Sequence, residues 1–249
     1  MATESIDTEA LTKLQPSRMI SETFIERHHK TTATGERIPD ASIDAMAQVV
    51  KRAKDTCHSV VTLGKTLAVD PTMMPAAKAI ALRDRASKGL DAVIKRSDEV
   101  NQSIAGELAR IRADLDRLPT PASQVDSMLE GEMRAALARM TDEDRGKAIA
   151  DSLEGDQRVI AAALRGPAML SGLRETQQGY WKTRWRESRD PAAVERLARL
   201  EEAKNAFDRS MDGVVDFYAA ASNLEGIQQA LQAQEMTARA LASVGGGES

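Results

Sequence analysis

Apolar residues recur at helical spacing between Pro75 and Leu118, the longest stretch of the chain that one period describes. From Leu90 onward, nine positions are spaced alternately by four and three residues, and seven of them are apolar. These positions are Leu90, Ile94, Ser97, Asn101, Ile104, Leu108, Ile111, Leu115 and Leu118. This heptad spacing predicts one long helix with a coiled-coil-like seam.

Two polar residues, Ser97 and Asn101, interrupt this seam and are candidates for setting the register of a helix pair. A buried Asn in a coiled coil lowers stability but fixes register and strand number, so self-association through this helix is one interpretation. In the other interpretation, Val93 and Val100 shift the apolar face by one position and leave Asn101 at its margin. The sequence leaves both open.

The length of this helix bears on the expected shape. A continuous helix from residue 75 to residue 118 would be about 65 Å long, whereas a compact chain of this size should be roughly 45 Å across. We therefore expect either an elongated molecule or a kinked helix.

A second heptad pattern runs from Asp40 to Ala68. Its positions are Ile43, Met46, Val50, Ala53, Cys57, Val60, Gly64 and Leu67. Because Cys57 lies in this seam, we expect a small buried side chain at this position and not a nucleophile. Prolines at positions 71 and 75 mark a short turn before the long helix. Residues 40–118 are thus predicted to form a long antiparallel helical hairpin.

Residues 1–39 are predicted to form an N-terminal helical arm and a linker. Residues 4–14 and a segment that Ser17 can cap have weak helical character. The polar sequence HHKTTATGERIPD that follows contains a glycine and a proline, so we interpret it as the linker. The arm is expected to dock on its own chain or on a neighbouring one.

Shorter helices are predicted over residues 119–189, which begin with prolines at positions 119 and 121. One amphipathic segment has Val125, Leu129, Met133, Leu137 and Met140 on its apolar face. Thr141 is expected to cap the next helix, and the acidic residues 142–144 complement the positive end of its dipole. Gly166-Pro167 predicts a helix stop followed by a restart.

Residues 190–244 are predicted to form a C-terminal helical hairpin, and residues 245–249 a flexible tail. The first helix of this hairpin has a seam that only Lys204 breaks. Its positions are Ala193, Leu197, Leu200, Lys204, Phe207, Met211, Val214, Tyr218 and Ala221.

The composition favours helices in the whole chain. Apolar residues make up 42% and aromatic residues only 3%, which favours helices packed through small and aliphatic side chains over a sheet. The predicted fold class is an all-α, elongated helical bundle of antiparallel hairpins with coiled-coil-like seams.

A net charge of −4 gives no general attraction to nucleic acid or anionic lipid. A single cysteine excludes an intramolecular disulfide, which suits a reducing compartment. No apolar run approaches the roughly 18 residues that a helix needs to span a bilayer. We therefore expect a cytoplasmic protein without a membrane partner.

Basic and aromatic side chains are interleaved in residues 180–189. The candidate interaction residues are Tyr180, Trp181, Lys182, Arg184, Trp185, Arg186 and Arg189. On a helix the two tryptophans share a face that neighbouring helices can bury, while arginines cover their rings. Such a segment also suits a protein partner or, as a minor interpretation, the stacked bases of a nucleic acid. All three interpretations stay open.

Residues that enzymes and cofactor sites need are sparse. Residues 64–66 match the end of a phosphate-binding loop, but Ser59 stands where that loop requires a glycine. Histidines occur only at positions 28, 29 and 58, so neither a three-His site nor an HExxH site can form. We therefore expect no catalytic residue, metal, cofactor or small-molecule substrate, and the protein is predicted not to be an enzyme.

Residues 155–173 resemble a segment of a known class of proteins. Gly155-Asp156, an Ala-rich helix, Pro167-Ala168 and the sequence Leu170-Ser171-Gly172-Leu173 are similar to part of uncharacterised helical proteins from the structural gene modules of tailed bacteriophages and prophages. The resemblance implies a role in the virion or in its assembly.

The predicted function is therefore a non-enzymatic structural or assembly protein of phage or prophage origin. It would act through self-association, as a homo-oligomer or larger assembly, and through docking to other proteins. Its location would be the cytoplasm, or the virion if a phage encodes it. The alternative is a cytoplasmic helical adaptor or nucleic-acid-associated protein that uses residues 180–189.

Overall fold

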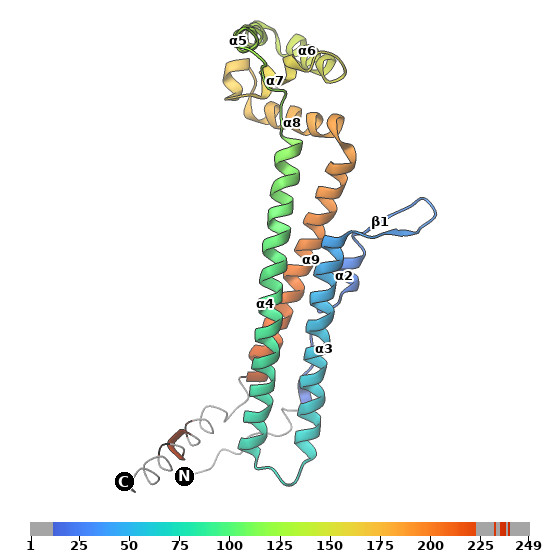
Figure 1. Cartoon of the computed structure of the whole chain (residues 1–249), viewed down its shortest axis with the longest axis vertical. Coiled ribbons are helices and arrows are strands. Elements are labelled where there is room, and N and C mark those ends of the chain that lie inside the picture. The colour runs from blue at the N-terminus through green and yellow to red at the C-terminus, as the bar shows by residue number, and fades with distance from the viewer. Residues whose placement is uncertain (1–11, 223–231, 233–234, 238, 240–249) are drawn as a thin grey trace. The chain divides into compact units, whose positions relative to one another are not determined.

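The computed structural model describes residues 12–222, 232, 235–237 and 239 (Figure 1). Helices account for nearly all regular structure in these residues, and the strands form one short hairpin. The predicted all-α class is confirmed. The helix expected at residues 4–14 and the second helix of the 190–244 hairpin lie mostly outside the described residues.

In chain order the elements are α2 (Thr23–Glu26), β1 (Lys30–Thr31), β2 (Arg37–Ile38), α3 (Ala41–Val69), α4 (Pro75–Leu115), α5 (Gln124–Arg139), α6 (Asp142–Glu154), α7 (Arg158–Leu164), η1 (Ala168–Ser171), α8 (Glu175–Arg189) and α9 (Pro191–Ser222). Of the helices in the described ranges, none is both long and apolar enough to cross a bilayer.

The chain divides into two compact units. The first unit comprises Met1–Ile104 and Arg199–Ser249, and the second unit comprises Ala105–Ala198. The boundaries fall inside helices α4 and α9, whereas the sequence predicts segments that begin at residues 119 and 190. The second unit is therefore a continuous piece of chain, and the first is made of two pieces.

Helix α3 of the first unit follows the predicted heptad pattern without exception. Asp40 caps it, since its carboxylate accepts a hydrogen bond from the Ser42 N–H over 3.1 Å. All eight predicted seam positions are buried. Burial raises the pKa of Cys57 to about 12, so the thiolate is disfavoured. Cys57 is confirmed as a small buried side chain.

The buried face of α4 departs from the predicted seam at Ile94 and Asn101, whereas the predicted positions Ser97, Ile104, Leu108, Ile111 and Leu115 are buried. Val93, Ser97 and Val100 are almost fully buried, whereas Ile94 is 37% exposed. Asn101 lies at the margin of this face and is partly buried. The register in which Val93 and Val100 form the contact is the observed one, and the placement of Ile94 in the seam is wrong.

A close approach of three helices at Gly89 accounts for this register. A Cβ atom on Gly89 of α4 would lie 2.5 Å from Thr56 Cγ2 of α3 and 3.0 Å from the Tyr218 hydroxyl oxygen of α9. Only glycine allows the three backbones to come this near without displacing a side chain. Val93 lies one turn further along the same face and continues the contact.

Residues 28–40, predicted to be a linker, contain the β1–β2 hairpin instead. The paired residues are Lys30 with Ile38 and Thr31 with Arg37. Gly35 supplies the left-handed turn with a φ of 82°. Buried His29 accepts a hydrogen bond from the Asp40 N–H through Nδ1 over 3.1 Å. Strands of two residues are too short to show alternation of apolar and polar positions, so the sequence pattern missed them.

The described part of the N-terminal arm, from residue 12 onward, packs on its own chain. Helix α2 begins only at Thr23 and has no side-chain cap, so the cap predicted at Ser17 is wrong. The Ser17 hydroxyl instead accepts a hydrogen bond from the Met19 N–H in a turn. Ser210 of α9 donates to the Met19 carbonyl oxygen over 2.9 Å, which fastens the arm to that helix.

The second unit has a hydrophobic core of its own. Its buried members are Leu137, Ile149, Ile160, Ala163, Ala168, Leu173 and Trp185. The predicted cap of α6 is confirmed, since the Thr141 hydroxyl accepts a hydrogen bond from the Asp144 N–H over 3.2 Å. The predicted stop and restart is confirmed as well, because α7 ends at Leu164 and η1 begins at Ala168.

Substitution Gly89→Ala tests the three-helix contact. An added methyl group gains about 1 kcal/mol of helix propensity, but overpacking costs about 1–3 kcal/mol, so we expect a net loss of stability. The melting temperature followed by far-UV circular dichroism should therefore fall. Gly106→Ala on the same helix is the matched control. A Cβ atom there meets nothing within 4 Å, so this variant should gain up to about 1 kcal/mol. Equal effects of the two substitutions would contradict the close contact at Gly89.

Candidate docking surface

The aromatic residues of segment 180–189 do not form a common exposed surface. Trp185 on α8 is only 2% exposed and belongs to the core of the second unit. Trp181 is partly buried and packs against the same core. Tyr180 is 58% exposed and meets Trp181 edge-on, with ring centroids 5.0 Å apart. Of the three aromatic residues, Tyr180 is the most exposed.

The basic residues of this segment are engaged within the second unit. Asp116 binds Arg186 through two hydrogen bonds of 2.6 and 2.9 Å, and Lys182 through an ion pair of 3.0 Å. Arg184 pairs with Glu187 one turn along α8. Arg189 donates a hydrogen bond to the Arg117 carbonyl oxygen and lies over the Trp185 ring. The segment therefore fastens α8 to the end of α4, and each of its four basic side chains has a partner within the second unit.

Asp116 is the centre of this fastening. Burial is the largest single influence on its carboxyl and raises the pKa. The hydrogen bonds and charges of Arg186 and Lys182 together outweigh burial and hold the pKa below its ordinary value. The carboxylate is therefore more favourable in the folded chain than in the unfolded one.

Ser97 and Asn101 of α4, the two residues that could set the register of a helix pair, differ in how deeply they are buried. Ser97 is buried in the contact face of the first unit. Asn101 is only partly buried, although its Oδ1 atom is enclosed and has no hydrogen-bond partner among the described residues. Neither residue lies on an open face that would pair with a second copy.

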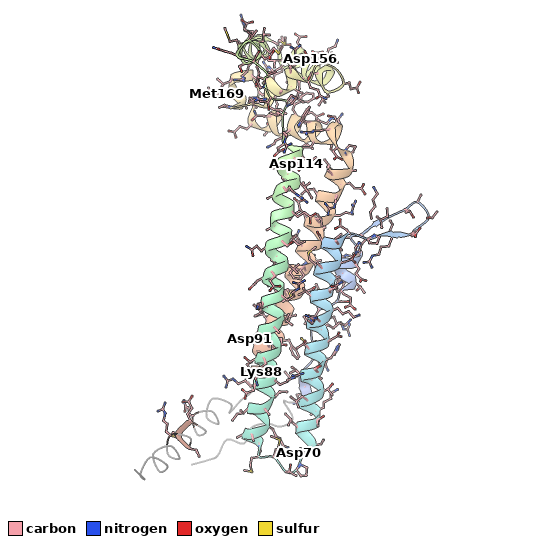
Figure 2. All side chains as sticks on the ribbon, viewed as in Figure 1. Asp70, Lys88, Asp91, Asp114, Asp156 and Met169 are labelled. Carbon is pink, nitrogen blue, oxygen red and sulfur yellow. The ribbon has the colours of Figure 1, made fainter. Side chains whose placement is uncertain are left out.

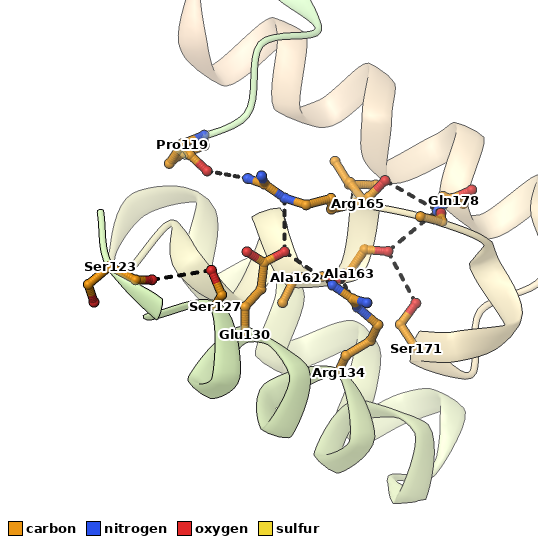
Figure 3. A network of polar contacts seen from close by, with 12 residues as sticks. Pro119, Ser123, Ser127, Glu130, Arg134, Ala162, Ala163, Arg165, Ser171 and Gln178 are labelled. Carbon is orange, nitrogen blue, oxygen red and sulfur yellow. Dashed lines mark hydrogen bonds and ion pairs between the residues drawn. The ribbon is translucent and has the colours of Figure 1, made fainter. Parts of the chain in front are cut away.

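Helix α5 turns a charged side chain inward (Figure 3). Glu130 is buried, forms an ion pair with Arg165 Nε over 2.9 Å and accepts a hydrogen bond from Arg134 Nη2 over 3.2 Å. Arg165 also donates to the Pro119 carbonyl oxygen, and Arg134 to that of Ala162. One carboxylate and two guanidinium groups thus join α5, α7 and the segment before α5.

The outward side of α5 carries exposed apolar residues in its N-terminal half. Val125 is 64% exposed, Met128 is 65% exposed, and Leu129 is also in contact with solvent. Of the five positions that the sequence placed on the apolar face, Leu137 is buried and Met133 is partly buried. The other three are exposed, so the prediction is wrong at Val125, Leu129 and Met140. The ion pairs of Glu130 rotate the helix away from its most apolar face. The sequence shows that Val125, Met128 and Leu129 lie near one another on α5. This spacing indicates an exposed stripe only once the partners of Glu130 are known.

A cavity of about 260 Å³ lies beside this stripe. It is lined by residues 119–122, by Asp126, Leu129, Glu130 and Met133 of α5, and by Arg158 and Ala161 of α7. On η1, Met169 and Leu170 are also exposed, and the Met169 side chain is labelled in Figure 2. The second unit therefore carries apolar surface with a hollow beside it, features typical of protein docking sites.

Chemical groups for catalysis do not converge on this surface. Within the described ranges, no group of three or more His, Cys, Asp or Glu side chains is placed to hold a metal ion. The charged residues that line the cavity are Asp126, Glu130 and Arg158, and each has a partner already: Ser123, Arg165 and Asp156 respectively. What the surface offers is apolar contact area.

Comparisons of the chain with protein-family models, with curated proteins and with solved structures find no match.

Substitution Asp116→Asn tests the fastening of α8. At pH 7 it should lower the free energy of unfolding by about 2 kcal/mol, because two charge-assisted hydrogen bonds are weakened. A carboxylate with a lowered folded pKa stabilises above its unfolded pKa of about 3.9 and loses this contribution as the pH falls through the folded value. The difference from wild type should therefore shrink below about pH 4.

Both tryptophans lie in the second unit, so urea unfolding followed by tryptophan fluorescence reports on that unit. Asp114→Asn is the control, because Asp114 makes only an exposed ion pair with Arg117. It should stay within about 0.5 kcal/mol of wild type at each pH. A deficit for Asp116→Asn that persists undiminished at low pH would show that the lost charge is not its cause.

Substitution Glu130→Ala tests the buried pair. It leaves Arg165 and Arg134 without their carboxylate, and breaking a buried pair in this way costs about 3–5 kcal/mol. Tryptophan fluorescence should report a large loss of stability of the second unit. Glu132→Ala, two residues along on the solvent side, should be nearly neutral. Similar losses for the two variants would mean that the Glu130 pair does not hold the unit together.

Proposed function

We propose that this chain is a non-enzymatic structural or assembly protein, of phage or prophage origin, that works by docking to proteins through its second unit. The observation that carries the proposal is the exposed apolar surface in the N-terminal half of α5, on a helix that buries a charge. This helix buries Glu130 and exposes Val125 and Met128. A helix that folds only for its own chain would bury the apolar residues and expose the charge.

The free energy of burying apolar side chains favours a partner that covers this surface of α5. Exposed Val125, Met128 and Leu129 lie within one and a half turns of α5, and the cavity beside Leu129 can receive a side chain of a partner. Burial of such side chains contributes about 1.5–3 kcal/mol each. Methionine suits such contacts because its flexible thioether adapts to the shape of the partner.

The assignment to phage or prophage structural modules is supported by the resemblance of residues 155–173. In this chain the segment forms α7 and η1, which pack against α5 in the second unit. The resembling segment and the proposed docking surface are therefore parts of one folded body.

Nucleic-acid binding by residues 180–189 has less support. Lys182 and Arg186 both pair with Asp116, and Trp185 lies in the core, where it cannot stack on a base. The variant Arg184→Glu/Arg186→Glu should leave any DNA affinity unchanged. A salt-sensitive affinity that this double variant abolishes would favour the nucleic-acid function instead.

Photo-crosslinking tests the docking surface directly. Benzoylphenylalanine placed at Val125 of the full chain, in cells that carry its native gene neighbourhood, should give covalent protein adducts on irradiation. Adding Met128→Glu should reduce them about tenfold, since an unpaired carboxylate in an apolar contact costs more than the 1.4 kcal/mol that a factor of ten requires.

The matched control places the same amino acid at Val215 of α9, an exposed apolar position of the first unit. It should give few adducts. Absence of adducts from Val125, or equal yields from the two positions, would overturn the proposed function.

A further inference from the structure

A continuous row of apolar side chains runs along one side of α5, and we call it the apolar row of α5. Its positions, spaced by three or four residues, are Val125, Leu129, Met133, Ala136 and Met140. Met133 is partly buried and the other four are exposed. The row extends over about 22 Å, which is about four turns of helix. A partner therefore meets a long, straight strip of apolar surface.

The middle of the row forms one wall of the cavity of about 260 Å³. Leu129 and Met133 contribute this wall, and residues 119–122 and Ala161 of α7 belong to the opposite one. A large apolar side chain of a partner can enter between the two walls, while its neighbours rest on Val125 and Ala136. The surface thus suits a segment with one central anchor and smaller contacts on either side.

The backbone of the partner segment decides which conformation can dock here. Residues 105–198 are all described and none lies in a strand, so the second unit has no sheet edge for an extended segment to join. The backbone groups of α5 bond within its own helix. On the opposite wall, Pro119 and Pro121 have no N–H group, and Arg165 already donates to the Pro119 carbonyl oxygen. An extended segment would leave its backbone groups unpaired, whereas a helix pairs its own.

Proline-rich segments bind in another way, but they dock in grooves that aromatic rings line. Neither the apolar row nor the lining of the cavity beside it contains an aromatic residue. Of the three common modes of peptide recognition, docking of an amphipathic helix is the one that this surface fits.

A carboxylate lies at the edge of the row. Glu132 follows Leu129 by three residues and precedes Ala136 by four, so it is on the same side of α5. It is exposed and makes no ion pair with any described residue. A basic residue beside the apolar side of a partner helix would supply the missing charge.

We propose that the apolar row of α5 binds an amphipathic helix of a partner protein, about four turns long, with apolar residues at i, i+4, i+7 and i+11 and a basic residue opposite Glu132. This inference rests on the proposed function and names the kind of partner that the surface takes. The largest apolar side chain of the partner enters the cavity beside Leu129, and the others lie along the row.

Mapping of crosslinks to single partner residues tests the helix. Benzoylphenylalanine is placed at Val125, Leu129 or Ala136 of the full chain, in cells that carry its native gene neighbourhood. Mass spectrometry of the digested adducts then identifies each attached residue. Val125 and Ala136 are about 16 Å apart along α5. Their attachment sites should be about eleven residues apart on a partner helix, with that of Leu129 between them, but only about five apart on an extended segment.

Gly131 is the control position on the same helix. It follows Leu129 by two residues, which is about 200° around the helix. A Cβ atom there would meet nothing within 4 Å, so the bulky amino acid should be tolerated. Because Gly131 faces away from the apolar row, it should give few adducts.

Charge reversal tests the basic residue of the partner. Glu132→Lys should lower the yield of adducts from Val125 about fivefold, because it sets two like charges against each other. Its melting temperature should stay that of wild type, since Glu132 is exposed. Asp98→Lys in the first unit is the matched control, because Asp98 is also exposed and makes no ion pair with any described residue. It should leave the yield unchanged.

The outcomes separate this inference from the proposed function. Attachment sites at extended spacing, equal yields from Gly131 and the row, or no effect of Glu132→Lys would overturn the helical partner, while adducts from Val125 would keep the docking function. Attachment to peptides of this chain itself would make the occupant a second copy and overturn the inference as well. If Val125 gave no adducts at all, both the inference and the proposed function would fall.

Discussion

The ion pair between Glu130 and Arg165 is the interaction on which the exposed surface of the second unit depends. A buried carboxylate is tolerated only while its cations stay in place. Arg165 also holds the Pro119 carbonyl oxygen, so one guanidinium group fixes both α5 and the segment that leads into it. Rotating α5 to bury Val125 would bring Glu130 toward water and separate it from Arg165. The exposure of Val125 and Met128 therefore follows from the burial of Glu130.

Heptad spacing was sufficient to predict much of the first unit, because burial there repeats along each helix. Every predicted seam position of α3 is buried. Of the predicted seam positions of α9, all are buried except Ala193 and Lys204, which are partly buried. The phase of α4 could not be predicted in the same way. It is set at Gly89 by side chains of two other helices, and the spacing of one helix contains no information on that contact.

The candidate site was harder to predict, because its geometry depends on pairs of residues distant in sequence. The sequence identified Trp181, Trp185 and their basic neighbours but left open whether they face a partner or the core. Asp116, which is 70 residues before Arg186, decides that question by drawing α8 onto the end of α4. The apolar residues of α5 were assigned to the core for a similar reason, since the partner of Glu130 lies on α7.

The division of the chain sets the order in which its parts can be completed during translation. The second unit is continuous, so all of its residues have left the ribosome once residue 198 has emerged. The first unit begins earlier but must wait for residues 199–222 before α9 can cover the apolar faces of α3 and α4. For the synthesis of about a hundred residues, those two helices have only each other and the N-terminal arm for cover. A nascent chain that stalls in this interval exposes apolar surface, which makes this interval the stage at which chaperones would matter most.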